Sequence, residues 1–600
     1  MSDAAAQADE QGVGTLPGWD LNDLYPGPGS PELEQDLAAM RASAEAFEDR
    51  YAGRLAEIDG PGLGDAIAEY EAIEEILGRV MSYASLMHAG AVDDAEVGRF
   101  FQTMHERITD ISAHLLFFTL ELNRLDDDAL ADKMGAPGAA HYASWVRDQR
   151  AFRPHQLSDE VEKLLHDKSV VGRAAWTRLF DQTIDGLRFP IDGKELTSAE
   201  ALHLMSDPDG AVRERAAGAL TEVLGANVRC FALITNTLIK DKEIEDRWRG
   251  FARPISSRNL ANQVEDTVVD ALLDAVKNAY PRLSHRYYAI KARWLGVDAL
   301  DHWDRNAPLP DDDDRVVPWG EAVDTVLGAY GAFSGEMADL GKRFFDNAWI
   351  DAGVRAGKSP GAFSHPTVPS AHPYILLNYQ GRARDVMTLA HELGHGVHQL
   401  LAAERGALMA DTPLTLAETA SVFGEQLTFR AMLGAEDDAK RRRVMLAGKV
   451  EDMINTVVRQ VAFCEFERRL HDERRAGELT PERIGEIWLA VQGESLGPAI
   501  RFDDGYSAYW SYIPHFVHTP FYVYAYAFGE CLVNSLYAVY QDSAEGFQER
   551  YLTMLRAGGT LRHKELLAPF GLDASDPAFW SKGLDVISGF IDELEAAKEW

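Results

Sequence analysis

Cysteine is scarce in this sequence, and no two of its three cysteines, Cys230, Cys464 and Cys531, form a C-x-x-C pair. An odd number of scattered cysteines argues against a disulfide framework. The N-terminus, MSDAAAQADEQG, also lacks the basic start and the apolar stretch of a secretory signal. We therefore expect a soluble protein of the cytoplasm.

A long uninterrupted apolar run is also missing. The nearest approach spans residues 521–540, where Glu530, Asn534 and Ser535 interrupt the apolar residues. A spanning helix needs about 20 consecutive apolar residues. We interpret this segment as a buried helix and expect no membrane partner.

Basic residues are outnumbered: 59 Lys and Arg face 96 Asp and Glu, which gives a formal net charge of −37. A surface field of this sign repels phosphate backbones, so nucleic acid is not expected as a partner. The hydrophobic share of 46% is ordinary for a globular protein, but 600 residues exceed what one core usually fills. We expect two or three structural units. Length alone does not place their boundary, but the hairpin segment described next suggests a seam between an N-terminal helical domain over residues 1–195 and a second domain over residues 196–600, which is the candidate catalytic domain because of the motif described below.

The pattern of apolar residues favours helices along most of the chain. Apolar residues recur three and four apart from Pro31 to about Arg150, and again from Ser198 past Ile290. Between these stretches, DGLRFPIDGKELT predicts a small hairpin, because Asp-Gly stands next to short β-prone runs. The fold class is therefore predicted to be mainly α.

A short strand and a long helix follow each other at residues 374–406. Residues 374–379 form an apolar run bounded by turn formers, which predicts a β-strand. The next segment, RARDVMTLAHELGHGVHQLLAAERG, has helical apolar spacing from Val386 to Leu400 and a stop signal at Gly406. A small β-sheet is thus expected beside this helix.

The helix carries the string His391-Glu392-Leu393-Gly394-His395. At about 3.6 residues per turn, His391 and His395 share one face, so both imidazoles can reach one metal ion. Glu392 stands beside the first ligand, where a carboxylate can take a proton from water. The alternative is a coincidental match on an amphipathic helix.

A catalytic zinc uses three protein ligands and one open position, so a third ligand is needed. The segment LTLAETASVFGEQL predicts a helix over residues 414–427 with Glu418, Ser421 and Glu425 on one face. Glu418 is the expected third ligand and Glu425 a candidate to orient a ligand from behind. The alternative is a solvated acidic face.

Two further residues of the motif helix compete for roles at the metal. His398 lies about 10 Å along the axis from His391, which is too far for a shared ion, and we expect a structural histidine. Asp385 is a candidate to orient an imidazole or, alternatively, an ordinary carboxylate of a helix N-terminus.

Phenols and imidazoles are dense in DDGYSAYWSYIPHFVHTPFYVYAYAFGE, residues 503–530. Peptide hydrolysis requires donors to the oxyanion of the tetrahedral intermediate, and Tyr or His can supply them. Buried tyrosines are also common in ordinary cores. Residue density alone leaves both interpretations open.

HELGHGVHQ followed by ETAS resembles the thimet-oligopeptidase-like zinc metallopeptidases, most closely their oligoendopeptidase F branch. The segments HPYILLNYQGRARDVMTLAHELGHGVHQ and IPHFVHTPFYVYAYA resemble that branch, as do RPHQLSDEVEKLL, RLFD and RYYAIKARWLG. The resemblance covers most of the chain.

The resemblance implies a role for each matching residue. It implies that His391, His395 and Glu418 bind one Zn²⁺ per chain and that Glu392 is the base that deprotonates water. It also implies that His515, Tyr522 and Tyr526 bind the carbonyl oxygen and the substrate backbone. The thimet branch's glycine-rich loop is missing and the His-to-Tyr spacing differs by about a residue, which leaves His518 and Tyr524 as alternatives.

The implied fold is a two-lobed helical ellipsoid with a deep substrate channel, which admits short unfolded peptides. The implied function is a zinc-dependent endopeptidase that hydrolyses internal bonds of such oligopeptides. A related zinc exopeptidase (a carboxypeptidase) and an inactive helical peptide-binding protein are the alternatives. Zinc is the expected ion, although His₂Glu sites also hold cobalt or manganese in vitro. The sequence leaves the oligomeric state open between a monomer and a weak homo-oligomer.

Overall fold

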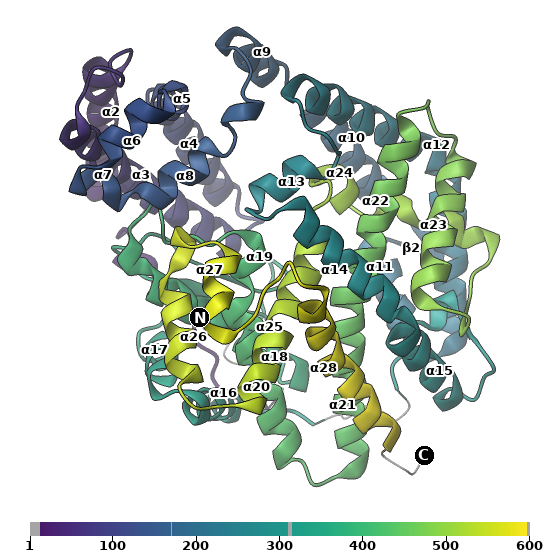
Figure 1. Ribbon diagram of the computed structural model, residues 1–600. Helices are drawn as coiled ribbons and strands as arrows, with labels where there is room; N and C mark the ends of the chain where they lie inside the picture. Colours follow the sequence, from purple (N-terminus) through teal and green to yellow (C-terminus); the bar gives the residue numbers. More distant parts are fainter. Residues whose placement is uncertain (1–11, 170, 310–314, 597–600) are drawn as a thin grey trace. The chain divides into compact units, whose positions relative to one another are not determined.

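The computed structural model describes residues 12–169, 171–309 and 315–596. The prediction that no secretory signal is present rests on the acidic N-terminal segment. Residues 1–11 of that segment lie outside the described residues. Helices dominate and strands are few and short (Figure 1). The predicted fold class, mainly α with a small sheet, is confirmed.

Contacts divide the chain into two compact units that alternate along the sequence. Unit 1 is formed by residues 1–153, 314–435 and 540–571, and unit 2 by residues 154–313, 436–539 and 572–600. The predicted division into domains 1–195 and 196–600 stays a prediction. It cuts the chain once, whereas each compact unit is built from three separate segments.

Unit 1 contains the N-terminal helices, the sheet and the motif helix. Its elements are α2 Pro31–Tyr51, α3 Gly60–Gly90, α4 Ala95–Ser112, α5 Leu116–Arg124, α6 Asp127–Met134, α7 Pro137–His141, α8 Ala143–Arg150, α16 Trp319–Phe333, α17 Gly335–Asp346, β4 Ile350–Asp351, β5 Phe363–His365, β6 Tyr374–Leu376, α18 Ala383–Ala402, α19 Leu414–Ala417, α20 Thr419–Ala435, α26 Phe547–Arg556 and α27 His563–Leu567.

Unit 2 contains the longest helix and the aromatic segment near the C-terminus. Its elements are α9 Asp159–Ser169, α10 Arg173–Gly186, β1 Phe189–Ile191, β2 Lys194–Leu196, α11 Ser198–His203, α12 Gly210–Arg249, α13 Ser256–Ala261, α14 Asp266–Ala279, α15 Ser284–Trp294, β3 Leu300–Asp301, η5 His302–Asp304, α21 Ala439–Ile454, η7 Asn455–Arg459, α22 Gln460–Arg474, α23 Pro481–Leu496, β7 Ile500–Arg501, η8 Asp504–Tyr512, α24 His515–His518, α25 Tyr524–Asp542 and α28 Pro577–Ala596.

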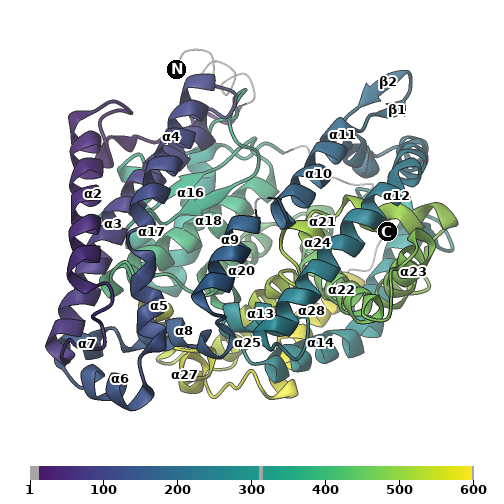
Figure 2. The ribbon, with the colours of Figure 1, turned by 90° about the horizontal axis from the view of Figure 1, so that it is seen from above.

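The first long helices of unit 1 form as the sequence predicts. The Ser30 hydroxyl caps α2 by accepting a hydrogen bond from the Leu33 backbone N–H at 3.3 Å, with Pro31 at the first helical position. Leu33, Leu37 and Phe47 are fully or almost fully buried. Helices α2, α3 and α4 lie side by side (Figure 2).

The predicted hairpin is present as β1 and β2, which pair antiparallel with Ile191 opposite Lys194. The two turn residues, Asp192 and Gly193, have φ angles of 51° and 79°. Positive φ at both positions is the requirement of a type I′ turn, which suits the twist of a two-residue hairpin. The Asp-Gly signal was therefore sufficient here.

A three-stranded sheet in the order β4-β6-β5 lies beside the motif helix in unit 1. The central strand, β6, pairs parallel with β4 and antiparallel with β5. It is shorter than the predicted run 374–379 because β4 offers only two residues and β5 only three for pairing. The predicted position of the sheet next to the motif helix is confirmed.

Two helices bear on the membrane question. The predicted buried helix near residues 521–540 is confirmed as α25, whose residues 527–537 are all buried. Among the described residues, only α12 is long and apolar enough to span a membrane by length and composition. A core helix of a soluble protein passes the same test, so this match is weak.

Candidate active site

Asp385 fixes the start of α18. Its carboxylate accepts hydrogen bonds from the backbone N–H groups of Gln380 and Arg382, both at 2.9 Å. A carboxylate in the first turn also interacts favourably with the helix dipole. Of the two interpretations of Asp385, the structure therefore supports the ordinary carboxylate at a helix N-terminus rather than a residue that orients an imidazole.

Two glycines allow the neighbouring helices to approach α18 closely. A Cβ atom at Gly394 would lie 2.5 Å from the carbonyl oxygen of Ala420 in α20. A Cβ atom at Gly396 would lie 2.4 Å from a ring carbon of Phe344 in α17. Both distances are shorter than real contacts, so no larger residue fits without displacing a neighbour. The start of α20 is therefore held directly against the motif.

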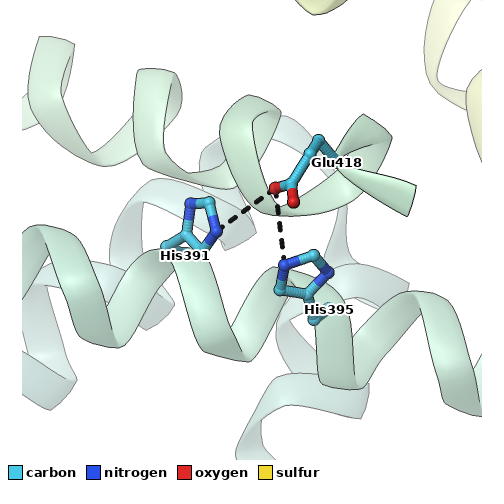
Figure 3. Close-up of side chains that lie close together, drawn as sticks. All are labelled: His391, His395 and Glu418. Carbon is cyan, nitrogen blue, oxygen red and sulfur yellow. Dashed lines mark ion pairs between the residues drawn. The ribbon is translucent and has the colours of Figure 1, made fainter. Parts of the chain in front are cut away.

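The two motif histidines face a single carboxylate oxygen. Oε2 of Glu418 lies 3.3 Å from Nε2 of His391 and 3.5 Å from Nε2 of His395. Figure 3 shows both imidazoles pointing toward this oxygen from consecutive turns of α18. One ligand atom from each residue lies within 4.8 Å of the others, and no other such group occurs among the described residues. This His₂Glu set suits a catalytic zinc ion.

Glu418 does not lie inside one helix over residues 414–427, and that prediction is corrected. The helix breaks there into α19 and α20, and Glu418 at the junction has φ −78° and ψ 0°. The hydroxyl of Thr419 donates to the carbonyl of Leu416 at 2.6 Å, and that of Ser421 donates to Oε2 of Glu418 at 2.7 Å. Such local bonds compete with helix formation. The break places the carboxylate over α18.

A second carboxylate stands behind His391. Oε2 of Glu425 lies 3.3 Å from Nδ1 of His391, on the ring side opposite the atom that faces Glu418. Burial disfavours the imidazolium, but the two carboxylates together raise the pKa of His391 well above its usual value. Burial also opposes ionisation of Glu418, yet its bonds to His391 and His395 hold its pKa well below the usual value.

Glu392 is enclosed at the same site, with 7% of its surface exposed. Burial raises the pKa of its carboxyl group, although the neighbouring His391 and His395 act in the opposite direction. The backbone of Ser364 in β5 also favours the ionised form. The edge strand of the sheet thus lies beside the carboxylate, a neighbour that the sequence did not reveal.

His398 has the structural role that was expected of it. It is buried, its partner is the backbone of Leu555, and burial lowers its pKa to about 4. It also lines a cavity of about 140 Å³ together with the ligand candidate His395 and the carboxylate of Asp411. This cavity offers room for a side chain next to the histidines.

The residues predicted at the C-terminal aromatic segment meet in unit 2. Nε2 of His515 lies 3.4 Å from the hydroxyl of Tyr526, and the rings of Tyr522 and Tyr526 lie 5.2 Å apart. Phe521, just before them, has a positive φ of 59°, a strained value for a bulky residue. Three groups that can donate hydrogen bonds are therefore held together here.

The alternative residues of that segment have other partners. His518 pairs through Nε2 with Asp181 at 2.7 Å. The hydroxyl of Tyr524 accepts a hydrogen bond from the Asn262 amide at 2.9 Å, and its ring is completely buried. These contacts give His518 and Tyr524 structural roles within unit 2, and the roles of His515, Tyr522 and Tyr526 stay a prediction. His391, Glu392, His395 and Glu418 belong to unit 1.

Known families match the chain over most of its length. The model of Peptidase family M3 matches residues 203–586, and that of Oligopeptidase F matches residues 121–189. Oligopeptidase PepF of Bacillus subtilis is 26% identical over 96% of this chain and 86% of its own length. Group B oligopeptidase PepB of Streptococcus agalactiae is 27% identical over 96% of each chain.

Solved structures share the fold. The crystal structure of oligoendopeptidase-F from Enterococcus faecium matches with a TM-score of 0.72 at 22% identity, over 94% of this chain and 98% of its own. A structure from Chlamydophila abortus matches with a TM-score of 0.84 at 24% identity, over 97% and 98%. Both likenesses extend across both units.

Proposed function

The chain belongs to peptidase family M3 and is a metallo-oligopeptidase, and on that premise we propose that zinc, held by His391, His395 and Glu418, is its catalytic metal. The observation that carries the proposal is the meeting of two Nε2 atoms at one oxygen of Glu418. The reaction that this zinc centre catalyses is the hydrolysis of internal bonds in short unfolded peptides.

The donor set fits zinc rather than a hard cation. Two imidazoles and one carboxylate are the ligands of many catalytic zinc sites, whereas calcium and magnesium prefer oxygen ligands alone. A zinc ion bound there supplies the Lewis acid that makes water nucleophilic near neutral pH. Glu425 fixes the His391 ring from its far nitrogen.

Glu392 is the proposed general base. Its enclosed carboxylate, beside Ser364, takes the proton of the attacking water and delivers it to the leaving amine. The raised pKa brings the group closer to neutral pH, where a base and its conjugate acid can both act. Next to it, the cavity that Asp411 lines takes a substrate side chain.

His515, Tyr522 and Tyr526 are proposed to bind the substrate carbonyl and backbone, as the family resemblance implies. Their support is the contact between His515 and Tyr526 and the engagement of His518 and Tyr524 elsewhere. Burial and the nearby Arg459 lower the pKa of His515, which keeps its imidazole neutral at pH 7. A neutral imidazole and a phenol are both donors to a developing oxyanion.

Tyr526→Phe is expected to lower kcat by about 100- to 1,000-fold with little change in KM, because one oxyanion donor is removed. Steady-state kinetics on a quenched peptide measure both constants. Tyr524→Phe is the matched control: it removes the bond to Asn262 and costs stability, but kcat stays within about threefold. The reverse pattern would assign the role to Tyr524.

Glu425→Gln is expected to weaken zinc binding by about 10- to 100-fold, because the partner that orients His391 loses its charge. Titration with a competing chelator measures this affinity. At saturating zinc, most of the activity returns. Unchanged zinc affinity would show that Glu425 does not support the ligand.

We also propose that the protein works in the cytoplasm on peptides, without a nucleic-acid or membrane partner, as a monomer or weak homo-oligomer. The excess of acidic residues and the scarcity of cysteine support this setting. Size-exclusion chromatography with light scattering determines the oligomeric state directly.

The proposed function is tested with an internally quenched peptide of about ten residues whose two ends are blocked. Cleavage at an internal bond that a chelator stops and zinc restores supports a zinc endopeptidase. Removal of only one or two residues from a free chain end, identified by mapping the products, would indicate the exopeptidase. No cleavage of several sequences at stoichiometric zinc would leave only a peptide-binding role.

A further inference from the structure

Two partly exposed arginines of unit 2 have no acidic partner among the described residues. Neither Arg305 nor Arg459 forms a side-chain hydrogen bond or an ion pair with a described residue, and Nε of Arg459 is fully enclosed. The Arg459 guanidinium lies 5.0 Å from the ring centroid of Phe463. A buried Nε–H group without a partner is costly, and a partly exposed guanidinium that has no ion pair can bind an anion.

Hydrogen-bond donors surround the two guanidinium groups. Tyr288, Tyr506 and Tyr512 are the phenols whose electrostatic influence reaches both arginines. None of these three hydroxyls has a hydrogen-bond partner among the described residues, and the rings of Tyr288 and Tyr506 are buried. Tyr506 and Tyr512 lie six residues apart on η8, where residues three apart align along one face. We call these five residues the donor cluster.

The acid whose charge acts on Arg305 is already engaged elsewhere. Glu451 influences Arg305, but its carboxylate is bound by the ammonium group of Lys291. The same ammonium donates to the backbone carbonyl of Arg305 at 2.8 Å, which fixes the arginine's position. Burial and the neighbouring Arg305 lower the pKa of Arg459. Burial acts on Arg305 in the same direction, but the nearby phenols and Glu451 outweigh it and raise its pKa. In a chain of net charge −37, two neighbouring arginines without an ion pair are unusual.

The backbone at Arg459 is also irregular. Residues Asn455–Arg459 form a π-helical turn between α21 and α22, and Arg459 is its last residue. Single π-helical turns inside α-helices are rare and occur frequently at functional sites. Arg459 also lies close enough to His515 to lower that imidazole's pKa. The cluster therefore adjoins a residue proposed to contact substrate.

We propose that the donor cluster binds the C-terminal α-carboxylate of the peptide substrate, with Arg305 and Arg459 as its two cationic partners. The proposal rests on the proposed peptidase function. Guanidinium groups and phenols present only donors at a carboxylate, and the arginine fork matches its two oxygens. Every unmodified oligopeptide carries this group whatever its sequence, so the cluster favours a free chain end without restricting side chains.

The test compares two quenched peptides of identical neutral sequence, one ending in a free carboxylate and one in an amide. The wild-type enzyme is expected to cleave the free acid with a kcat/KM about 10- to 100-fold higher, chiefly through KM. Arg459→Gln and Arg305→Gln move this ratio toward one. Arg483→Gln, which removes an exposed arginine paired with Glu473 and Glu486, retains it. A wild-type ratio near one overturns the proposal.

A binding measurement separates this proposal from the peptidase function. Calorimetry with the metal-stripped full-length protein compares the acid and amide forms of a tripeptide. Tighter binding of the acid than of the amide supports the carboxylate site even if the enzyme cleaves no peptide. Peptide cleavage without any preference for the acid overturns the carboxylate site and leaves the peptidase function intact. Tyr512→Phe keeps both arginines and is expected to lower the preference for the acid over the amide about threefold. It tests the site even if the arginine variants fail to fold.

Two further arms distinguish the source of the anion. An amide peptide that ends in glutamate tests for a side-chain carboxylate, and its binding as tightly as the free acid overturns the assignment to the chain end. Inorganic phosphate and sodium chloride test for a free anion. Competition with the free acid at a shared site supports the donor cluster, whereas tight binding of either salt with no acid preference overturns the peptide ligand.

Discussion

Glu392→Gln is expected to lower kcat/KM by about 100- to 10,000-fold while zinc stays bound at one ion per chain. Glutamine keeps the size of the side chain but cannot take a proton from water. The ligands His391, His395 and Glu418 are unchanged, so metal content separates loss of the base from loss of the site. Kinetics on the quenched peptide and elemental analysis of the same sample measure both quantities.

The control for this prediction is Glu404→Gln, which changes an exposed glutamate just after α18 and is expected to leave kcat/KM unchanged. Substantial activity in Glu392→Gln, at full zinc content, would remove Glu392 from the role of base. Loss of zinc from the variant would instead show that Glu392 supports the metal centre.

The sequence was most informative where a signal is local. Helical spacing and Gly406 predicted a helix over residues 382–406, and α18 spans Ala383–Ala402. The Asp-Gly pair predicted the hairpin of β1 and β2 for the same reason, since turn chemistry depends on neighbouring residues. The spacing of His391 and His395 likewise follows from one helical turn.

The sequence was less informative where contacts join distant segments. The break at Glu418 depends on the hydroxyls of Thr419 and Ser421, which bond to the Leu416 carbonyl and to the Glu418 carboxylate, and residues 414–423 contain neither proline nor glycine to signal it. Periodicity therefore predicted one continuous helix. The contact between Ser364 and Glu392 needs a sheet edge that no local pattern reveals.

The aromatic segment shows a further limit. Density alone could not separate buried tyrosines from functional ones, because both are the same residue type, although in the structure Tyr524 is buried and Tyr522 and Tyr526 are partly exposed. The structure distinguishes them by partners: Tyr524 is bonded to Asn262, whereas Tyr526 meets His515. The same criterion singles out Arg305 and Arg459, to which the sequence analysis gave no role. Their roles stay predictions.

Gly394→Ala is expected to destabilise the protein by about 1–3 kcal/mol and to weaken zinc binding at least about tenfold, although alanine favours a helix more than glycine does. The new Cβ would lie 2.5 Å from the carbonyl oxygen of Ala420 and 2.7 Å from Cα of Ser421. Both are backbone atoms, so no side-chain rotation relieves the overlap, and the start of α20 must move away from α18. Because Glu418 directly precedes α20, its carboxylate moves away from the two imidazoles.

Gly328→Ala provides the matched comparison for this effect. Gly328 lies in α16 of the same unit, is exposed, and has no atom within 4 Å of an added Cβ. Its replacement is expected to raise the free energy of unfolding by about 0.5–1 kcal/mol and to leave zinc affinity unchanged. Chemical denaturation and chelator competition on both variants give the two quantities. Wild-type zinc affinity in Gly394→Ala would mean that the site tolerates a wider separation of α18 and α20 than its ligand distances indicate.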